Sequence, residues 1–104
     1  IFVLPSREEP FGQVYLEAMA SGLPCLGLRN RPGLTRVATE EIITDGQDGF
    51  WVEPDAEDDL TAKMELLLND DDLRRRLGSA ARRSCLARYS WQSHFDNLLL
   101  NVYE

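Results

Sequence analysis

Two continuous apolar runs, separated by a helical pattern, place the strongest limit on how this chain can fold. Residues 1–5 read IFVLP, and residues 24–28 read PCLGL. Short unbroken apolar runs that end at turn residues are typical of strands covered on both faces, as in parallel sheets. Between them, a helix is predicted from Phe11 or Gly12, with apolar stripes at Val14, Leu16, Ala18, Met19 and Ala20. Gly22 stands where a left-handed C-terminal cap is needed.

The same alternation continues along the chain. Residues 29–40 read as a loop with a Pro32-Gly33 turn, and residues 39–52 predict a short helix, a glycine-rich turn and a third strand at 50–52. The next helix follows Asp55, its predicted N-cap, and its apolar face consists of Leu60, Met64, Leu67 and Leu68. A second helix has its face at Leu73, Leu77, Ala81 and Cys85. A third, capped by Ser90, has its face at Trp91, Phe95, Leu98, Leu99 and Val102.

The order strand, helix, strand, helix, strand, helix predicts an α/β fold. Parallel strands joined by right-handed crossovers would form part of a doubly wound, Rossmann-like sheet, with three parallel strands, flanking helices and a helical C-terminus. Three strands are few for such a sheet, and the chain opens inside a strand without an initiating methionine. We therefore expect residues 1–104 to be the C-terminal portion of a longer domain.

Composition limits the partners and the setting. The net charge of −7, with 18 acids, argues against a nucleic-acid surface, which is normally basic. Cys25 and Cys85 show no CxxC spacing, so a metal site has no support; a disulfide stays open, although Cys25 is expected to be a buried free thiol. The sequence 70–72, three aspartates before an arginine-rich helix, indicates compensation of the helix dipole rather than a metal motif. With no signal peptide and no membrane-spanning run, we expect a reducing, cytoplasmic setting.

The loop after the first strand has the features of an anion site. Ligands of doubly wound sheets bind beyond the carboxyl ends of the strands, where the helix starting near Gly12 directs unpaired N–H groups and a positive dipole. Pro10 biases Glu9 toward an extended conformation. Glu17 lies roughly 7–8 Å along the helix axis from Gly12 at about 1.5 Å per residue. One ligand that carries a sugar, a diphosphate and a ribose can therefore meet Glu9, the helix N-terminus and Glu17 in order.

These residues resemble those of a known family. The segment 9–17, EPFGQVYLE, is similar to the E-x7-E motif of retaining, family-4-like glycosyltransferases of GT-B fold, the glycosyl transferases group 1. The segments EAMASGLPCLGL, EEIITDGQDGFWVEPDAEDDL and YSWQSHFDNLLLNVYE resemble the later motifs of that group. The resemblance covers essentially the whole chain. It departs at residues 29–39, which lack the usual Gly-Gly-x-x-Glu run, although Glu41 can take its glutamate position.

The resemblance implies a function and a set of roles. The chain would be part of the donor-binding domain of a metal-independent hexosyltransferase that uses a nucleotide-diphosphate sugar as substrate and needs no cofactor. Glu9 would be the catalytic residue that contacts the transferred sugar, and Glu17 would hold the ribose diol. Donor contacts through the backbone would come from Phe11, Gly12, Gln13, Val14 and Tyr15. The acceptor domain and the basic pair that clamps the diphosphate are expected upstream, so we expect the isolated chain to be inactive and to self-associate.

Two other functions stay open on the sequence. One is a receiver-like signalling domain, which needs an acidic cluster at strand ends and a lysine; the single lysine, Lys63, lies in mid-helix. The other is a glycosyltransferase-like module without activity that serves in binding. His94 is expected to be a surface or packing residue, and Trp51 and Trp91 are expected to be core residues rather than sugar platforms.

Overall fold

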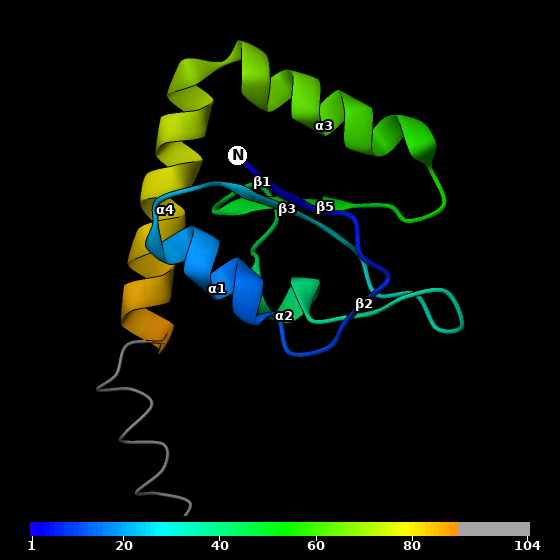
Figure 1. Cartoon of the computed structure of the whole chain (residues 1–104). Helices are drawn as coiled ribbons and strands as arrows, with labels where there is room; N and C mark the ends of the chain where they lie inside the picture. The colour runs from blue at the N-terminus through cyan, green and yellow to red at the C-terminus, as the bar shows by residue number, and fades with distance from the viewer. Residues whose placement is uncertain (90–104) are drawn as a thin grey trace, which may run out of the picture.

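A three-stranded parallel sheet forms the centre of the molecule (Figure 1). The computed structural model describes residues 1–89. The strands β1 (Phe2–Leu4), β3 (Cys25–Leu28) and β5 (Gly49–Val52) lie in the order β1-β3-β5, with Val3 opposite Leu26 and Leu26 opposite Phe50. The helices are α1 (Gln13–Ala20), α2 (Thr39–Ile42), α3 (Glu57–Asn69) and α4 (Asp71–Tyr89). The predicted parallel α/β architecture is confirmed.

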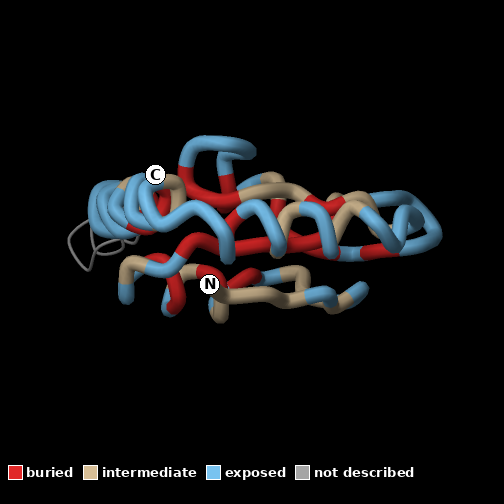
Figure 2. The backbone as a smooth tube through the Cα atoms, turned by 90° about the horizontal axis from the view of Figure 1, so that it is seen from above, coloured by how far each residue is buried: buried red, intermediate tan, exposed pale blue. Residues whose placement is uncertain are grey.

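Helices cover both faces of the sheet because alternate strand residues point to opposite sides. On one face, Cys25 packs with buried residues of α1, α2 and α4: Tyr15, Ala18, Met19, Ala38, Ile42, Ile43, Ala81 and Cys85. On the other face, Leu26 packs with Leu28, Val52, Leu67 and Leu77, and thus with α3 and the first part of α4. Figure 1 shows α3 on one side of the sheet, α1 and α2 on the other, and α4 along the end of both layers. Figure 2, seen from above, shows the buried segments along the middle of the molecule, with exposed segments around them.

The packing of α4 on α1 depends on close approach of the backbone. Gly22 follows Ser21, the C-cap residue of α1, and has a left-handed backbone with φ +78°, as the sequence predicts. The Gly22 N–H donates to the Met19 carbonyl at 2.9 Å. A Cβ at Gly78 of α4 would collide with the Gly22 carbonyl oxygen, so glycine at 78 lets α4 cross the end of α1.

The sequence predicted that the first strand is covered on both faces, and this prediction is only partly correct. All four residues of β3 are buried, whereas residues 1–4 are half-buried. Within residues 1–89, β1 pairs with β3 alone, so its second edge has no neighbouring strand. Both strands are apolar, so their difference in burial follows from their positions, which are central for β3 and at the edge for β1.

Two predictions about α3 are wrong. The helix begins at Glu57 after an extended Ala56, without a side-chain cap, so Asp55 is not its N-cap. Instead, the Asp59 carboxylate accepts the Glu53 N–H at 2.8 Å and so ties the start of α3 to the end of β5. Leu68 is 60% exposed, because the buried stripe through Leu67 does not reach the neighbouring position around the helix.

Both described cysteines are free and buried, which confirms the prediction for Cys25. Burial raises the pKa of the Cys25 thiol to about 12. The predicted third helix, with Ser90, Trp91, His94 and the later apolar residues, lies outside the described part of the chain. No helix within residues 1–89 combines the length and apolar character that a membrane crossing requires.

Candidate functional site

The loop after β1 is fixed by a second, very short parallel ladder. Strand β2 (Glu8–Glu9) pairs with β4 (Arg36–Val37), and the Glu9 carbonyl accepts the Ala38 N–H at 3.0 Å. These bonds hold the backbone of Glu9 at the carboxyl end of β1. The Glu9 side chain is half-buried and has no hydrogen-bond or ion-pair partner among residues 1–89. Two-residue strands carry no readable periodicity, so the sequence did not predict this ladder.

Gly12 forms the junction between this loop and α1. Its backbone is left-handed, with φ +66° and ψ 19°, and its carbonyl accepts the Tyr15 and Leu16 N–H groups at 3.0 and 3.4 Å. A side chain at this position would collide with Cδ1 of Ile42 and lie 3.2 Å from Cβ of Ala38. Only glycine therefore allows both this turn and the close contact with α2.

The N-terminus of α1 presents free donors. It has no side-chain cap and no acid in its first turn. The N–H groups of Phe11, Gly12, Gln13 and Val14 have no acceptor within the described residues. Such unpaired donors, together with the helix dipole, favour an anion.

The predicted site residues divide into two sets. Phe11 is 84% exposed, and Gln13 and Glu17 are exposed one turn apart on the same side of α1, while Val14 is half-buried. Glu9 and Gly12 lie at the junction before the helix, so five of the seven predicted residues lie at the helix N-terminus, and Glu17 lies one turn further along. Tyr15 differs from the others.

Tyr15 points into the core. Its side chain is fully buried, with the hydroxyl 3.3 Å from Thr39 Oγ1 and 3.5 Å from the Leu4 carbonyl oxygen. Burial raises the pKa of this hydroxyl. Because the Tyr15 N–H already donates to Gly12, the predicted backbone contact with a diphosphate would have to share that donor.

An ion-pair cluster, also not predicted, lies beyond the carboxyl ends of β3 and β5. The Glu53 carboxylate accepts from Arg29 Nη1 at 2.9 Å and from Arg31, and these arginines hold its pKa below the usual range. The Arg29 guanidinium also lies 5.4 Å from the centre of the Trp51 ring. Trp51 packs against the core, and its Nε1 donates to the Ile43 carbonyl at 2.7 Å, as a core role requires. The cluster joins residues more than 20 positions apart, so no sequence pattern predicts it.

Other candidate groups have structural roles. Lys63 Nζ bonds to Asp59 at 3.0 Å and to the Trp51 carbonyl. Asp70 Oδ1 accepts the Leu73 N–H at 3.0 Å, and Asp71 lies in the first turn of α4, where its charge complements the helix dipole. In the described range, no three His, Cys, Asp or Glu side chains are grouped to hold a metal ion.

Comparison with known proteins identifies the family. The sequence profile of glycosyl transferases group 1 matches residues 1–84, and the chain belongs to this family. It is 37% identical over 93 residues to the sulfoquinovosyl transferase SQD2 of Arabidopsis thaliana, covering 89% of this chain and 18% of that protein. It is 36% identical over 107 residues to spore coat protein SA of Bacillus subtilis, covering 100% of this chain and 26% of that one. The chain thus spans about a quarter or less of these relatives.

Solved structures agree with this assignment. A sucrose-phosphate synthase from Thermosynechococcus elongatus superposes with a TM-score of 0.78 at 26% identity, over 97% of this chain and 25% of that one. The C-terminal domain of the group 1 glycosyl transferase LpcC from Francisella tularensis gives 0.73 at 29% identity, over 86% of this chain and 43% of that one. The predicted α/β fold with three parallel strands is thus that of glycosyltransferases of the GT-B class. Because the chain belongs to this family, it is not a receiver-like signalling domain.

Proposed function

We propose that this chain supplies part of the donor site of a retaining glycosyltransferase that transfers a sugar from a nucleoside diphosphate to an acceptor. One observation carries the proposal. Four unpaired N–H groups, at Phe11 to Val14, lie between two exposed or half-exposed carboxylates, Glu9 and Glu17. This arrangement matches the succession of sugar, diphosphate and ribose in a nucleotide-sugar.

The proposed mechanism assigns each group a part of the donor. The N–H groups of residues 11–14 bind the diphosphate, and they act most strongly when the bond to the sugar breaks and negative charge develops on the leaving oxygen. The helix dipole adds to this stabilisation, so the transfer is proposed to be independent of metal. Glu9 contacts hydroxyls of the sugar, and Glu17 accepts two hydrogen bonds from the ribose diol.

The two carboxylates make separable contributions. In the protein that carries this chain, Glu17→Ala is expected to weaken nucleoside diphosphate and nucleotide-sugar alike, because both contain the ribose. The loss of charged hydrogen bonds, about 1.5–3 kcal/mol, corresponds to roughly ten- to hundredfold in affinity. Glu9→Ala is expected to spare the diphosphate and to lower kcat more than KM, since its contact strengthens in the transition state.

Isothermal titration with UDP, GDP and their sugars, together with transfer kinetics in the presence and absence of EDTA, tests this assignment. Glu65→Ala, an exposed acid of α3, is the matched control and is expected to change neither quantity. Unchanged diphosphate affinity in Glu17→Ala contradicts the ribose role. Donor binding without any transfer favours the inactive binding module instead, and loss of transfer in EDTA contradicts metal independence.

A further inference from the structure

Two buried hydroxyl groups meet in the core next to the start of α1. The Tyr15 hydroxyl lies 3.3 Å from Thr39 Oγ1, within hydrogen-bond distance, and 3.5 Å from the carbonyl oxygen of Leu4, the last residue of β1. Both the tyrosine and the threonine are fully buried. Burying polar groups has a cost that phenylalanine and valine would avoid while filling the same space. Packing alone therefore does not account for the two hydroxyls.

The sheet leaves room for this pair at Gly27 of β3. Leu4 and Gly27 lie opposite one another in the β1–β3 ladder. A Cβ at Gly27 would collide with the Tyr15 hydroxyl and lie 2.8 Å from Thr39 Oγ1. Glycine thus allows both hydroxyls to approach the strand closely. The pair lies near the carboxyl ends of β1 and β3, the edge beyond which doubly wound sheets bind their ligands.

Tyr15 is attached to the part of the site that is proposed to bind the diphosphate. It belongs to the first turn of α1, and its N–H donates to the Gly12 carbonyl at 3.0 Å. The four N–H groups proposed to bind the diphosphate, at residues 11–14, immediately precede it. Because all these residues lie within about one turn of chain, a shift of Tyr15 moves the four donors with it.

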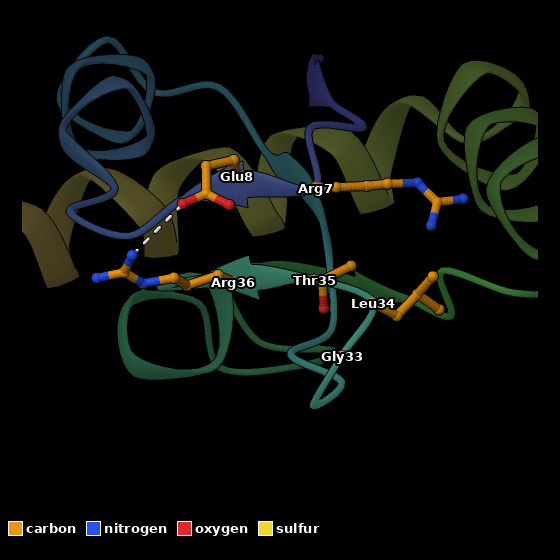
Figure 3. Close-up of a pocket in the computed structure, with 6 residues that line it drawn as sticks. All are labelled: Arg7, Glu8, Gly33, Leu34, Thr35 and Arg36. Carbon is orange, nitrogen blue, oxygen red and sulfur yellow. Dashed lines mark ion pairs between the residues drawn. The ribbon is translucent and has the colours of Figure 1, made fainter.

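Thr39 is attached to the segment that holds Glu9. The residue before it, Ala38, donates its N–H to the Glu9 carbonyl at 3.0 Å, directly after the β2–β4 ladder. Figure 3 shows this ladder, with Glu8 turned toward Arg36 across it. Since successive strand residues point to opposite sides, Glu9 points away from that pair. Thr39 is therefore one residue from the backbone bond that fixes the position of Glu9.

The Tyr15–Thr39 contact joins these two parts. Among residues 1–89, it is the hydrogen bond between α1 and α2. We propose that Tyr15 and Thr39 are positioning residues, whose hydrogen bond sets the spacing between the N–H groups of residues 11–14 and the Glu9 carboxylate. The inference rests on the proposed function, and neither buried side chain touches the donor. Sugar transfer depends on this spacing, whereas binding of a nucleoside diphosphate uses the α1 part alone.

The test measures kcat, KM and diphosphate affinity in the full-length protein that carries this chain, with the nucleotide-sugar that the titrations above show to bind. Tyr15→Phe and Thr39→Val keep the shapes of the side chains and remove one hydroxyl each. Each is expected to lower kcat about tenfold, less than the roughly hundredfold cost of a displacement of about 1 Å. KM and diphosphate affinity are expected to change by less than about twofold. Thr39→Ser keeps the hydroxyl and is expected to retain most of kcat.

Two further variants separate positioning from loss of stability. The double variant Tyr15→Phe with Thr39→Val is expected to lower kcat no further than either change alone, because both act through one bond. It leaves neither hydroxyl without its partner, so its melting temperature is expected to lie above that of Thr39→Val. Leu67→Val, in the core on the other face of the sheet, is the control. It is expected to lower the melting temperature through a lost methylene and to keep the parent kcat.

The outcomes separate this inference from the proposed function. A parent kcat in Tyr15→Phe, or a kcat that follows the melting temperature across all variants, overturns the positioning role. Equal losses of kcat and diphosphate affinity in Tyr15→Phe also overturn it, because the α1 terminus itself is then disturbed. In each of these cases the donor assignment stands if Glu17→Ala still loses diphosphate affinity. If Glu17→Ala binds the diphosphate as the parent does, the donor assignment is overturned, and the positioning role with it.

Discussion

Two structural features require glycine at position 12, a left-handed backbone and a close contact with Ile42, and mutations can separate their effects. The sequence indicated glycine there so that an anion could approach the backbone. The structure adds a left-handed φ of +66° and a close contact with Ile42. Gly46 offers a control, since its φ of +81° is also left-handed but a Cβ would have no atom within 4 Å.

We predict that Gly12→Ala destabilises the fold more than Gly46→Ala does. Each substitution places alanine in the left-handed region at a cost of about 1–2 kcal/mol. Only Gly12→Ala adds overpacking against α2, which costs a further ~1–3 kcal/mol. Urea unfolding followed by circular dichroism measures both. Equal losses would show that the contact with Ile42 relaxes freely and that backbone strain alone requires glycine.

At the scale of elements, the loop between β3 and β4 is held by charge rather than by a core. Glu53, at the end of β5, bonds to Arg29 and Arg31 of this loop. Glu40 lies 3.8 Å from Arg29 Nε, and its Oε1 accepts the Asn30 N–H of the same loop at 2.6 Å. The same loop supplies Gly33, Leu34 and Thr35 to a pocket that Arg7 also lines.

We predict that this loop loosens in acid. Hydrogen bonds from Arg31 and Arg29 lower the pKa of Glu53 from its usual 4.5. The unfolded or detached loop therefore takes up a proton first as the pH falls. The stabilisation is fully present above pH 4.5 and is lost as the pH falls through the lower folded pKa.

Amide shifts of Arg31, Leu34 and Thr35 against pH measure this transition. Glu53→Gln is expected to leave these shifts independent of pH, with the loop already loosened at pH 7. Glu40→Gln serves as the control, because it removes the charge 3.8 Å from Arg29 Nε while its amide oxygen can still accept the Asn30 N–H, and it is expected to retain most of the transition. If the transition is lost in Glu40→Gln but kept in Glu53→Gln, Glu40 rather than Glu53 holds the loop.

For the whole molecule, an unpaired sheet edge and exposed apolar side chains are the main liability. The second edge of β1 has no neighbour among residues 1–89. Because the Phe2 N–H donates to the Pro24 carbonyl, alternation along the strand turns the Val3 N–H toward the open edge. Large exposed apolar side chains occur elsewhere on the surface: Phe11, Leu23, Leu34, Leu66, Leu68 and Leu86.

We predict that residues 1–104 self-associate as the protein concentration rises, because open edges and apolar patches pair with other chains. Val3→Pro removes a donor from the open edge while leaving the β3 ladder intact, and is expected to reduce association. Sedimentation velocity over a hundredfold concentration range measures both chains. A parent chain that stays monomeric over this range contradicts the prediction. If Val3→Pro associates as strongly as the parent, the apolar helix faces rather than the open edge cause the association.

The sequence alone determined the elements that show a helical repeat or an unbroken apolar run. The order and type of β1, α1, β3, β5, α3 and α4 follow from apolar spacing, as does the buried face of α4 at Leu77 and Ala81. The motif around Glu9 and Glu17 indicated the group 1 family before any coordinates. These features depend on neighbours within one or two turns, which a linear sequence displays directly.

The tertiary structure decided what depends on distant residues. The half-burial of β1, the exposure of Leu68 and the bond of Asp59 to the Glu53 N–H in place of a cap from Asp55 follow from which element lies opposite each side chain. The β2–β4 ladder, the ion pairs of Glu53 with Arg29 and Arg31, and the pocket that Arg7 shares with Leu34 each join segments more than 20 residues apart. Two-residue strands and single ion pairs contribute too little periodicity to be recognised, because their partners are set by how the sheet and helices pack.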